Sequence, residues 1–132
     1  IKAASIGTLG VTGLKVKKNF SNTTFDTIQI NNILQKLKRK KIENVILEAS
    51  SHGLNQNRLY GLKFDVGIFT NLSRDHLDYH KNFKNYLNSK LILFRKLLRK
   101  NGTLIYDNQI KQKKLFESII KKRKLKKKSV TQ

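Results

Sequence analysis

The sequence predicts an α/β domain built on a mostly parallel sheet with helices on both faces. Short β-branched runs alternate with amphipathic helical stretches along the 132 residues, and this alternation is typical of βαβ units. Polar, ionisable residues also follow directly where two apolar runs end, at 47 and 69. In open α/β sheets ligands bind beyond the carboxyl ends of the strands. The length fits one domain with a real core and is too short for two.

The first half of the chain predicts strand, helix and strand. A strand over 1–9 ends in a glycine turn, and a loop follows. Thr23 or Thr24 is expected to cap a helix over 25–40, whose apolar residues recur at helical spacing. The β-branched run 44–47 fits a buried strand.

The second half repeats the pattern. The expected elements are a loop with a short helix over 51–62, a strand over 64–70, a polar loop over 71–82, a helix over 83–98 ended by Asn101-Gly102, a strand over 103–106, and a helix over 110–120 followed by a solvated basic tail. The segment between the strands at 44–47 and 64–70 is interpreted as the right-handed crossover of a βαβ unit.

Composition excludes several classes of protein. Without Cys, neither disulfides nor thiolate metal sites can form. No apolar run reaches the roughly 20 residues that span a bilayer, so we expect a cytoplasmic location without membrane insertion. We also expect a monomer. The net charge of +21 is compatible with nucleic acid, but no recognition module accompanies it, and we expect no nucleic-acid partner. Because the chain starts with Ile, we expect an internal fragment.

Two candidate metal ligands follow neighbouring strands. Glu48 closes the strand at 44–47, and His76 lies in the loop after the next strand. Glu48 offers the hard oxygen that magnesium prefers, whereas a histidine engaged in the loop by other partners is an equally good interpretation of His76. The same loop adds Asp75, Asp78 and His80 as further ligands or as partners of ligands.

A second group of residues predicts an anion-binding site. Ser50, Gln56 and Arg58 offer a hydroxyl, an amide and a guanidinium, which suit a carboxylate or phosphate. The stretch Asn22-Thr23-Thr24 at a helix start has two interpretations, an anion site on backbone N–H groups or an ordinary N-cap, and the cap is the commoner. The sequence has neither a Gly-x-Ser-x-Gly elbow nor a Gly-x-x-x-x-Gly-Lys-Thr phosphate loop.

Lys90 falls in the apolar face of the helix expected over 83–98. Burial disfavours the ammonium form and yields a neutral amine, which can act as a nucleophile or take up carbon dioxide as a carbamate. The alternative is a lysine at the edge of the face that extends its amine into solvent. Helix geometry alone favours that alternative.

These residues resemble the central domain of the Mur ligases, most closely the ligases that add the third residue to UDP-N-acetylmuramoyl-L-alanyl-D-glutamate. The resemblance covers about 7–105, with 1–110 as a partial central domain and 111–132 as an unassigned basic segment. The matching motifs are Asn22-Thr23-Thr24, 48–54, Gln56 with Arg58, 69–80, and Lys90.

The resemblance implies an ATP-dependent amide ligase that phosphorylates the D-glutamate carboxylate and attaches a diamino acid, meso-diaminopimelate in preference to L-lysine. It further implies magnesium held by Glu48, His76 and a carbamylated Lys90, and ATP contacted by Asn71. The muramoyl-dipeptide is then expected to contact Asn22, Thr23, Thr24, Ser50, Gln56 and Arg58. The alternatives are a folylpolyglutamate synthetase-type ligase and a basic nucleic-acid-binding module.

The sequence departs from the family pattern in two places. The family's phosphate-binding loop and its two flanking domains lie outside this chain, so we expect the fragment to be inactive alone. After the strand at 103–106 the family shows Asn-x-Asp-Asp near the nucleotide. This chain has Tyr106-Asp107-Asn108-Gln109 at that place.

Overall fold

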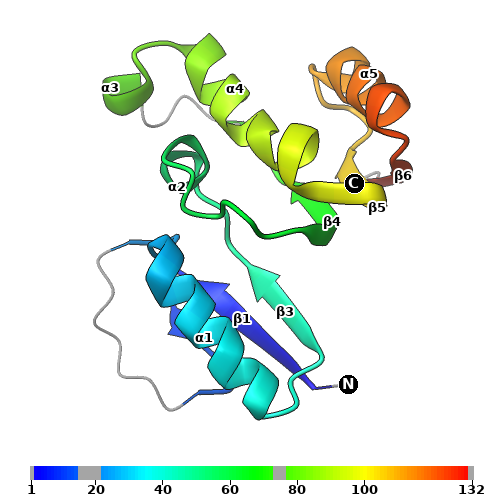
Figure 1. The fold of residues 1–132 in the computed structure, drawn as a ribbon. Coiled ribbons are helices and arrows are strands. Elements are labelled where there is room, and N and C mark those ends of the chain that lie inside the picture. The colour runs from blue at the N-terminus through cyan, green and yellow to red at the C-terminus, as the bar shows by residue number, and fades with distance from the viewer. Residues whose placement is uncertain (1, 15–21, 73–76, 131–132) are drawn as a thin grey trace. The chain divides into compact units, whose positions relative to one another are not determined.

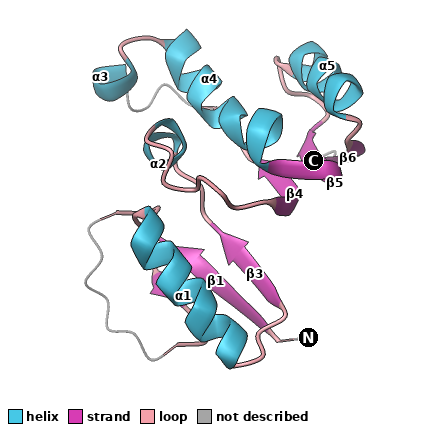
Figure 2. Ribbon diagram, in the orientation of Figure 1, coloured by secondary structure: helices cyan, strands magenta, loops and turns pink. Residues whose placement is uncertain are grey.

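A computed structural model describes residues 2–14, 22–72 and 77–130 of the chain. They form two compact units, Ile1–Tyr60 and Gly61–Gln132, where the sequence predicts a single one (Figure 1). Each unit has its own three-stranded sheet, and the strands at 44–47 and 64–69 belong to different sheets, so the predicted βαβ crossover between them is wrong. The α/β class is confirmed, and the pairings are mostly parallel (Figure 2).

Unit 1 consists of a small sheet and two helices. Its sheet has the order β2-β1-β3, with β1 Ala3–Gly7 antiparallel to the short β2 Gly10–Val11 and parallel to β3 Asn44–Leu47. Helix α1, Thr27–Arg39, lies across one face of this sheet (Figure 1). The second helix, α2, is short and spans Ser51–Asn55.

Helix α1 is held by an apolar stripe at the predicted spacing. Ile30, Ile33 and Leu37 are buried, as are Ala4 and Ile6 on the alternate positions of β1. Apolar side chains recur every 3.6 residues along the helix and every second residue along the strand, so each element presents one apolar face and the two faces pack together. The helix begins later than predicted, and its N-cap is Asp26, whose carboxylate accepts from the Gln29 amide at 2.8 Å. The predicted cap at Thr23 or Thr24 is therefore wrong.

Unit 2 has a fully parallel sheet of order β4-β5-β6. Its elements in chain order are β4 Phe64–Phe69, α3 Leu77–His80, α4 Phe83–Ile92, the π-helix η1 Leu93–Leu97, β5 Leu98–Asp107, α5 Lys113–Arg123 and β6 Lys126–Val130. One core cluster joins α4, η1, α5 and the strands β4 and β5, with Phe116 of α5 in ring contact with Phe69, Phe94 and Tyr106. Burial of these large rings is the main stabilising term of the unit.

Two features of unit 2 differ from the prediction. The helix expected over 83–98 changes to π geometry at Leu93, and Leu98 already starts β5. Asn101, at a positive φ of 63°, lies in an irregularity where the pairing of β5 with β4 shifts from Leu98 to Thr103. Asn101-Gly102, predicted to end the helix, thus forms a bulge inside β5.

The basic tail contains a strand that the sequence does not predict. Lys126–Val130 forms β6, which pairs in parallel with β5, and every residue of it is exposed. Consecutive lysines are poor strand formers, yet lysine is well suited to an edge strand because its charge blocks further pairing. Arg123, just before it, donates to the backbone carbonyls of Arg95 and Leu98, the latter at 2.7 Å.

Candidate functional site

The carboxyl ends of β1 and β3 lie side by side and bring Thr8 to Glu48. Ile6 pairs with Leu47, and the Glu48 amide donates to the Ile6 carbonyl at 2.8 Å. Beyond this pair, both the amide and the hydroxyl of Thr8 donate to Glu48 Oε2 at 2.9 Å. Sequence reasoning selected Glu48 and missed Thr8, although Thr8 also follows a strand end.

The hydroxyls of Thr23 and Thr24 contact the residues around Glu48. The Thr8 hydroxyl lies 3.1 Å from Thr23 Oγ1. Thr24, only 1% exposed, has its hydroxyl 2.9 Å from the Glu48 carbonyl oxygen and 3.0 Å from Ser50 Oγ, and it accepts from the Ser50 amide at 2.8 Å. Thr24 thus joins the predicted metal ligand to the predicted anion site. These bonds replace the N-cap role that the sequence favoured for the threonines.

Ser50 is the N-cap of α2, where its side chain accepts from the Gly53 amide at 3.1 Å. Gly53 is required here for packing, because a Cβ at that position would lie 2.6 Å from Thr24 Cβ and 2.9 Å from its hydroxyl oxygen. The sequence Ser-Ser-His-Gly therefore fits this backbone closely.

Arg58 completes the group, because its guanidinium forms hydrogen bonds with both Thr24 and Gln56. Its Nη1 donates to the Thr24 carbonyl at 2.7 Å, while Nε and Nη2 donate to Gln56 Oε1 at 2.9 and 2.6 Å. Each terminal nitrogen of an arginine carries a second N–H, which leaves donors for an anionic ligand. The predicted residues Thr23, Thr24, Ser50, Gln56 and Arg58 are thus brought together in one unit. Asn22 is exposed and directly precedes them.

Lys90 lies in α4 of unit 2 and is half-buried. Its amine is 5.1 Å from the Tyr86 ring centre and 5.8 Å from that of Phe69. It donates to the Asn71 carbonyl at 3.3 Å, just beyond β4. The lysine is thus neither fully desolvated nor simply extended into solvent, and its amine is directed to the carboxyl end of a strand.

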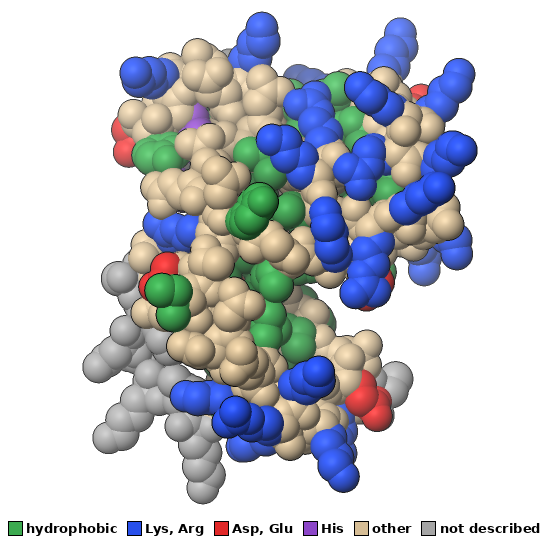
Figure 3. All heavy atoms as spheres, viewed as in Figure 1, with side chains coloured by type: hydrophobic (Ala, Val, Ile, Leu, Met, Phe, Trp, Pro, Cys, Tyr) green, Lys and Arg blue, Asp and Glu red, His purple; other side chains and the backbone are tan. Residues whose placement is uncertain are grey.

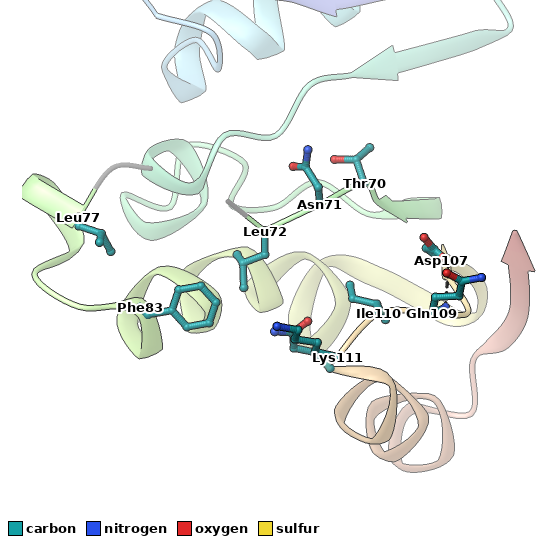
Figure 4. A pocket seen from close by; sticks show the side chains of 10 residues that line it. Thr70, Asn71, Leu72, Leu77, Phe83, Asp107, Gln109, Ile110 and Lys111 are labelled. Carbon is teal, nitrogen blue, oxygen red and sulfur yellow. Dashed lines mark hydrogen bonds between the residues drawn. The ribbon is translucent and has the colours of Figure 1, made fainter. Parts of the chain in front are cut away.

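A pocket of about 900 Å³ opens at the carboxyl ends of β4 and β5 (Figure 4). Asn71 lines this pocket. Tyr106 does not, because its ring is 1% exposed and stacked on Phe116. The other lining residues are Thr70, Leu72, Leu77, Phe83, Asp107, Gln109, Ile110, Lys111 and Gln112. The pocket combines an apolar lining with amide, hydroxyl and charged groups, as small-molecule sites do.

The remaining predicted metal ligands lie in or next to the loop after β4. His76 and Asp75 lie outside the described residues. Asp78 is exposed. His80 is 4% exposed and packs inside unit 2, with Nδ1 3.4 Å from Ser89 Oγ and its ring against Tyr86. Within the described residues, no three His, Asp or Glu side chains gather as a metal cluster.

Basic side chains dominate the surface. On the face shown in Figure 3, Lys and Arg far outnumber Asp and Glu. Such a field attracts anionic ligands in general and does not select among them. In the part of the chain that the structure describes, no helix is long and apolar enough to cross a bilayer.

The fold and these sites define an α/β domain whose polar side chains gather at the carboxyl ends of parallel strands, where the ligands of such domains bind. Comparison with known proteins identifies it further: the model of the Mur ligase middle domain matches residues 1–132. The chain therefore belongs to the Mur ligase family, and the match includes the basic segment that the sequence left unassigned.

Several relatives are named UDP-N-acetylmuramoyl-L-alanyl-D-glutamate–2,6-diaminopimelate ligase. The protein of Rickettsia bellii is 43% identical over 130 residues, which are 95% of this chain and 27% of the relative. That of Wigglesworthia glossinidia brevipalpis is 43% identical over 90% of this chain and 25% of the relative. That of Buchnera aphidicola subsp. Schizaphis graminum is 48% identical over 70% and 19%. The chain spans about a quarter or less of the length of these relatives.

Proposed function

We propose that this chain is the central part of an ATP-dependent, cytoplasmic and monomeric ligase that attaches meso-diaminopimelate to UDP-N-acetylmuramoyl-L-alanyl-D-glutamate. Diaminopimelate is preferred to lysine because the relatives are named for it. The observation that carries the proposal is the bonded group around Thr24, which joins Glu48, Ser50 and Arg58 at the ends of β1 and β3. The amine of the diamino acid would attack the acyl phosphate formed on the D-glutamate carboxylate, so that the amide bond forms as inorganic phosphate leaves.

The muramoyl-dipeptide is proposed to contact the donors of unit 1. Arg58 is oriented by Gln56 and by the Thr24 carbonyl, so its remaining N–H groups have a fixed direction. A guanidinium held in this way can bind a carboxylate or a phosphate with little loss of side-chain entropy on binding. Asn22, Thr23 and Ser50 are proposed as further contacts of the same substrate.

Glu48 fits a magnesium ligand. Thr8 engages only its Oε2 atom, and no hydrogen bond among the described residues engages Oε1. Magnesium keeps several waters and needs only one or two protein carboxylates beside substrate phosphates, so a single oriented carboxylate is sufficient. The bound cation would neutralise charge that develops on the transferred phosphoryl group. His76 and a carbamylated Lys90 are proposed as further ligands.

The pocket of unit 2 is proposed as the nucleotide site. Its apolar lining, including Leu72 and Ile110, suits a flat heteroaromatic base. Asp107 and Gln109 line it as well, and the Gln109 amide donates to Asp107 Oδ1 at 2.8 Å. Together with Asn71, these two residues would make the polar contacts to the nucleotide that the Asn-x-Asp-Asp motif makes in other members of the family.

Lys90→Ala in the complete protein that contains this chain tests the proposal. We expect the mutant to lose ligation of diaminopimelate, and added formate or acetate to restore part of it, because a small carboxylate can replace the carbamate. Lys63→Ala is the matched control, since the Lys63 amine also donates to a backbone carbonyl of unit 2, that of Lys96 at 3.1 Å. Near-normal turnover of Lys90→Ala would overturn the role of Lys90. A wild-type protein without ligase activity would overturn the proposed function.

A further inference from the structure

We propose that Thr8 is a positioning residue that fixes the Glu48 carboxylate for its cation. The inference rests on the proposed function and goes beyond it, because it gives a role to a residue outside every motif considered above. Thr8 directly follows β1, and Glu48 directly follows the neighbouring strand β3. The parallel pairing of the two strands places them next to each other.

The two bonds from Thr8 converge on one carboxylate oxygen. Both the amide and the hydroxyl of Thr8 lie 2.9 Å from Glu48 Oε2. Donors of this kind, aimed at an ionised carboxylate, form charge-assisted bonds that are shorter and stronger than neutral ones. Two bonds to this one oxygen hold Oε2 in place and leave Oε1 as the oxygen that can bind a ligand.

Gly7 closes the remaining side of this carboxylate. A Cβ on Gly7 would lie 2.6 Å from Glu48 Oε2 and 2.9 Å from Glu48 Cβ. The second distance involves the rigid root of the side chain, so rotation of the carboxylate would not relieve the overlap. Gly7 and Thr8 thus form a close-fitting seat for Glu48, which the loose packing of an ordinary exposed glutamate would not require.

The seat also connects the cation ligand to the substrate side of the site. The Thr8 hydroxyl lies 3.1 Å from Thr23 Oγ1, and Thr23 is a proposed contact of the muramoyl-dipeptide. The Thr8 hydroxyl therefore contacts both Glu48, a proposed metal ligand, and Thr23, a proposed substrate-binding residue. Ligands of a metal depend on such outer partners for their orientation, and the loss of one typically costs about 10- to 100-fold in metal affinity.

The test is the affinity of the complete protein for Mn²⁺, measured by electron paramagnetic resonance in the absence of nucleotide and substrate. Thr8→Val removes the hydroxyl and keeps the amide, and we expect it to raise the Mn²⁺ dissociation constant about tenfold or more. Thr8→Ser keeps both donors and should stay within about threefold of wild type. Thr12→Val is the control, because the Thr12 hydroxyl accepts from the Ser5 amide at 2.7 Å in the same hairpin and does not contact Glu48.

The Mn²⁺ concentration that half-saturates ligation gives a second measurement on the same variants, with the same expected order. Glu48→Gln separates the inference from the proposed function. If Glu48→Gln loses Mn²⁺ affinity and Thr8→Val binds as wild type does, Thr8 is not a positioning residue. If Glu48→Gln also binds as wild type does, the proposed metal role of Glu48 itself fails. Thr8→Val that loses affinity no more than Thr12→Val does would likewise overturn the inference.

Discussion

Thr24→Val is the substitution that most sharply tests the arrangement of unit 1. Valine keeps the shape of threonine and removes only the hydroxyl, which contacts the Glu48 carbonyl and the Ser50 amide at 2.9 and 2.8 Å. Thr24 is 1% exposed, so water cannot readily replace the hydroxyl. Each backbone group left without a partner costs about 1–3 kcal/mol. Two such groups, each partly buried, predict a local loss of about 2–4 kcal/mol.

Hydrogen exchange of the Ser50 amide in the complete protein measures this loss locally. About 2 kcal/mol corresponds to exchange faster by roughly 30-fold, at about 1.4 kcal/mol per factor of ten. Thr12→Val serves as the control, because it removes a threonine hydroxyl from the same unit at an exposed bond. If Ser50 in Thr24→Val exchanges within about threefold of wild type, the bonds to Thr24 do not hold this segment, and the reasoning is refuted.

Two further substitutions test packing and helix termination. Gly53→Ala should lower stability by about 1–3 kcal/mol through overpacking against Thr24, measured by urea unfolding; unchanged stability would mean that the close fit is absent. Arg123→Met keeps the apolar stem and removes the bonds to two backbone carbonyls at the end of η1, and we expect a loss of about 1–2 kcal/mol. Exposed Lys122→Met is its control, and equal effects of the two would show that the bonds contribute nothing.

Much of the fold can be predicted from hydrophobic periodicity, and much of the site from the residues that follow strand ends. The strand at 44–47 has the predicted bounds, because a short β-branched run between polar residues has few alternatives. Its predicted burial is wrong, since Asn44, Val45 and Ile46 are exposed. Asp26, and not a threonine, caps α1, since the threonine hydroxyls have tertiary partners that local sequence does not reveal. Strand β6 was missed because its pairing with β5 is a tertiary effect on a lysine-rich segment.

The site shows the same division between local and tertiary information. Ser50 and Arg58 were predicted from residue type and from their place behind a strand. Thr8 lies directly behind β1 in the structure, but the strand predicted over 1–9 includes Thr8, so a search of predicted strand ends does not select it. Tyr106 could not be assigned from sequence alone, because only the structure shows its ring inside the core against Phe116.

Binding of UDP-N-acetylmuramoyl-L-alanyl-D-glutamate to the complete protein, measured by calorimetry without ATP, tests the central claim most directly. Arg58→Gln should weaken binding at least about tenfold, as expected when a charged hydrogen bond to a ligand is lost. Arg99→Gln should bind as wild type does, because Arg99 forms an exposed ion pair with Asp65 on unit 2. Equal affinities for wild type and both variants would contradict the claim that the residues around Thr24 hold this substrate.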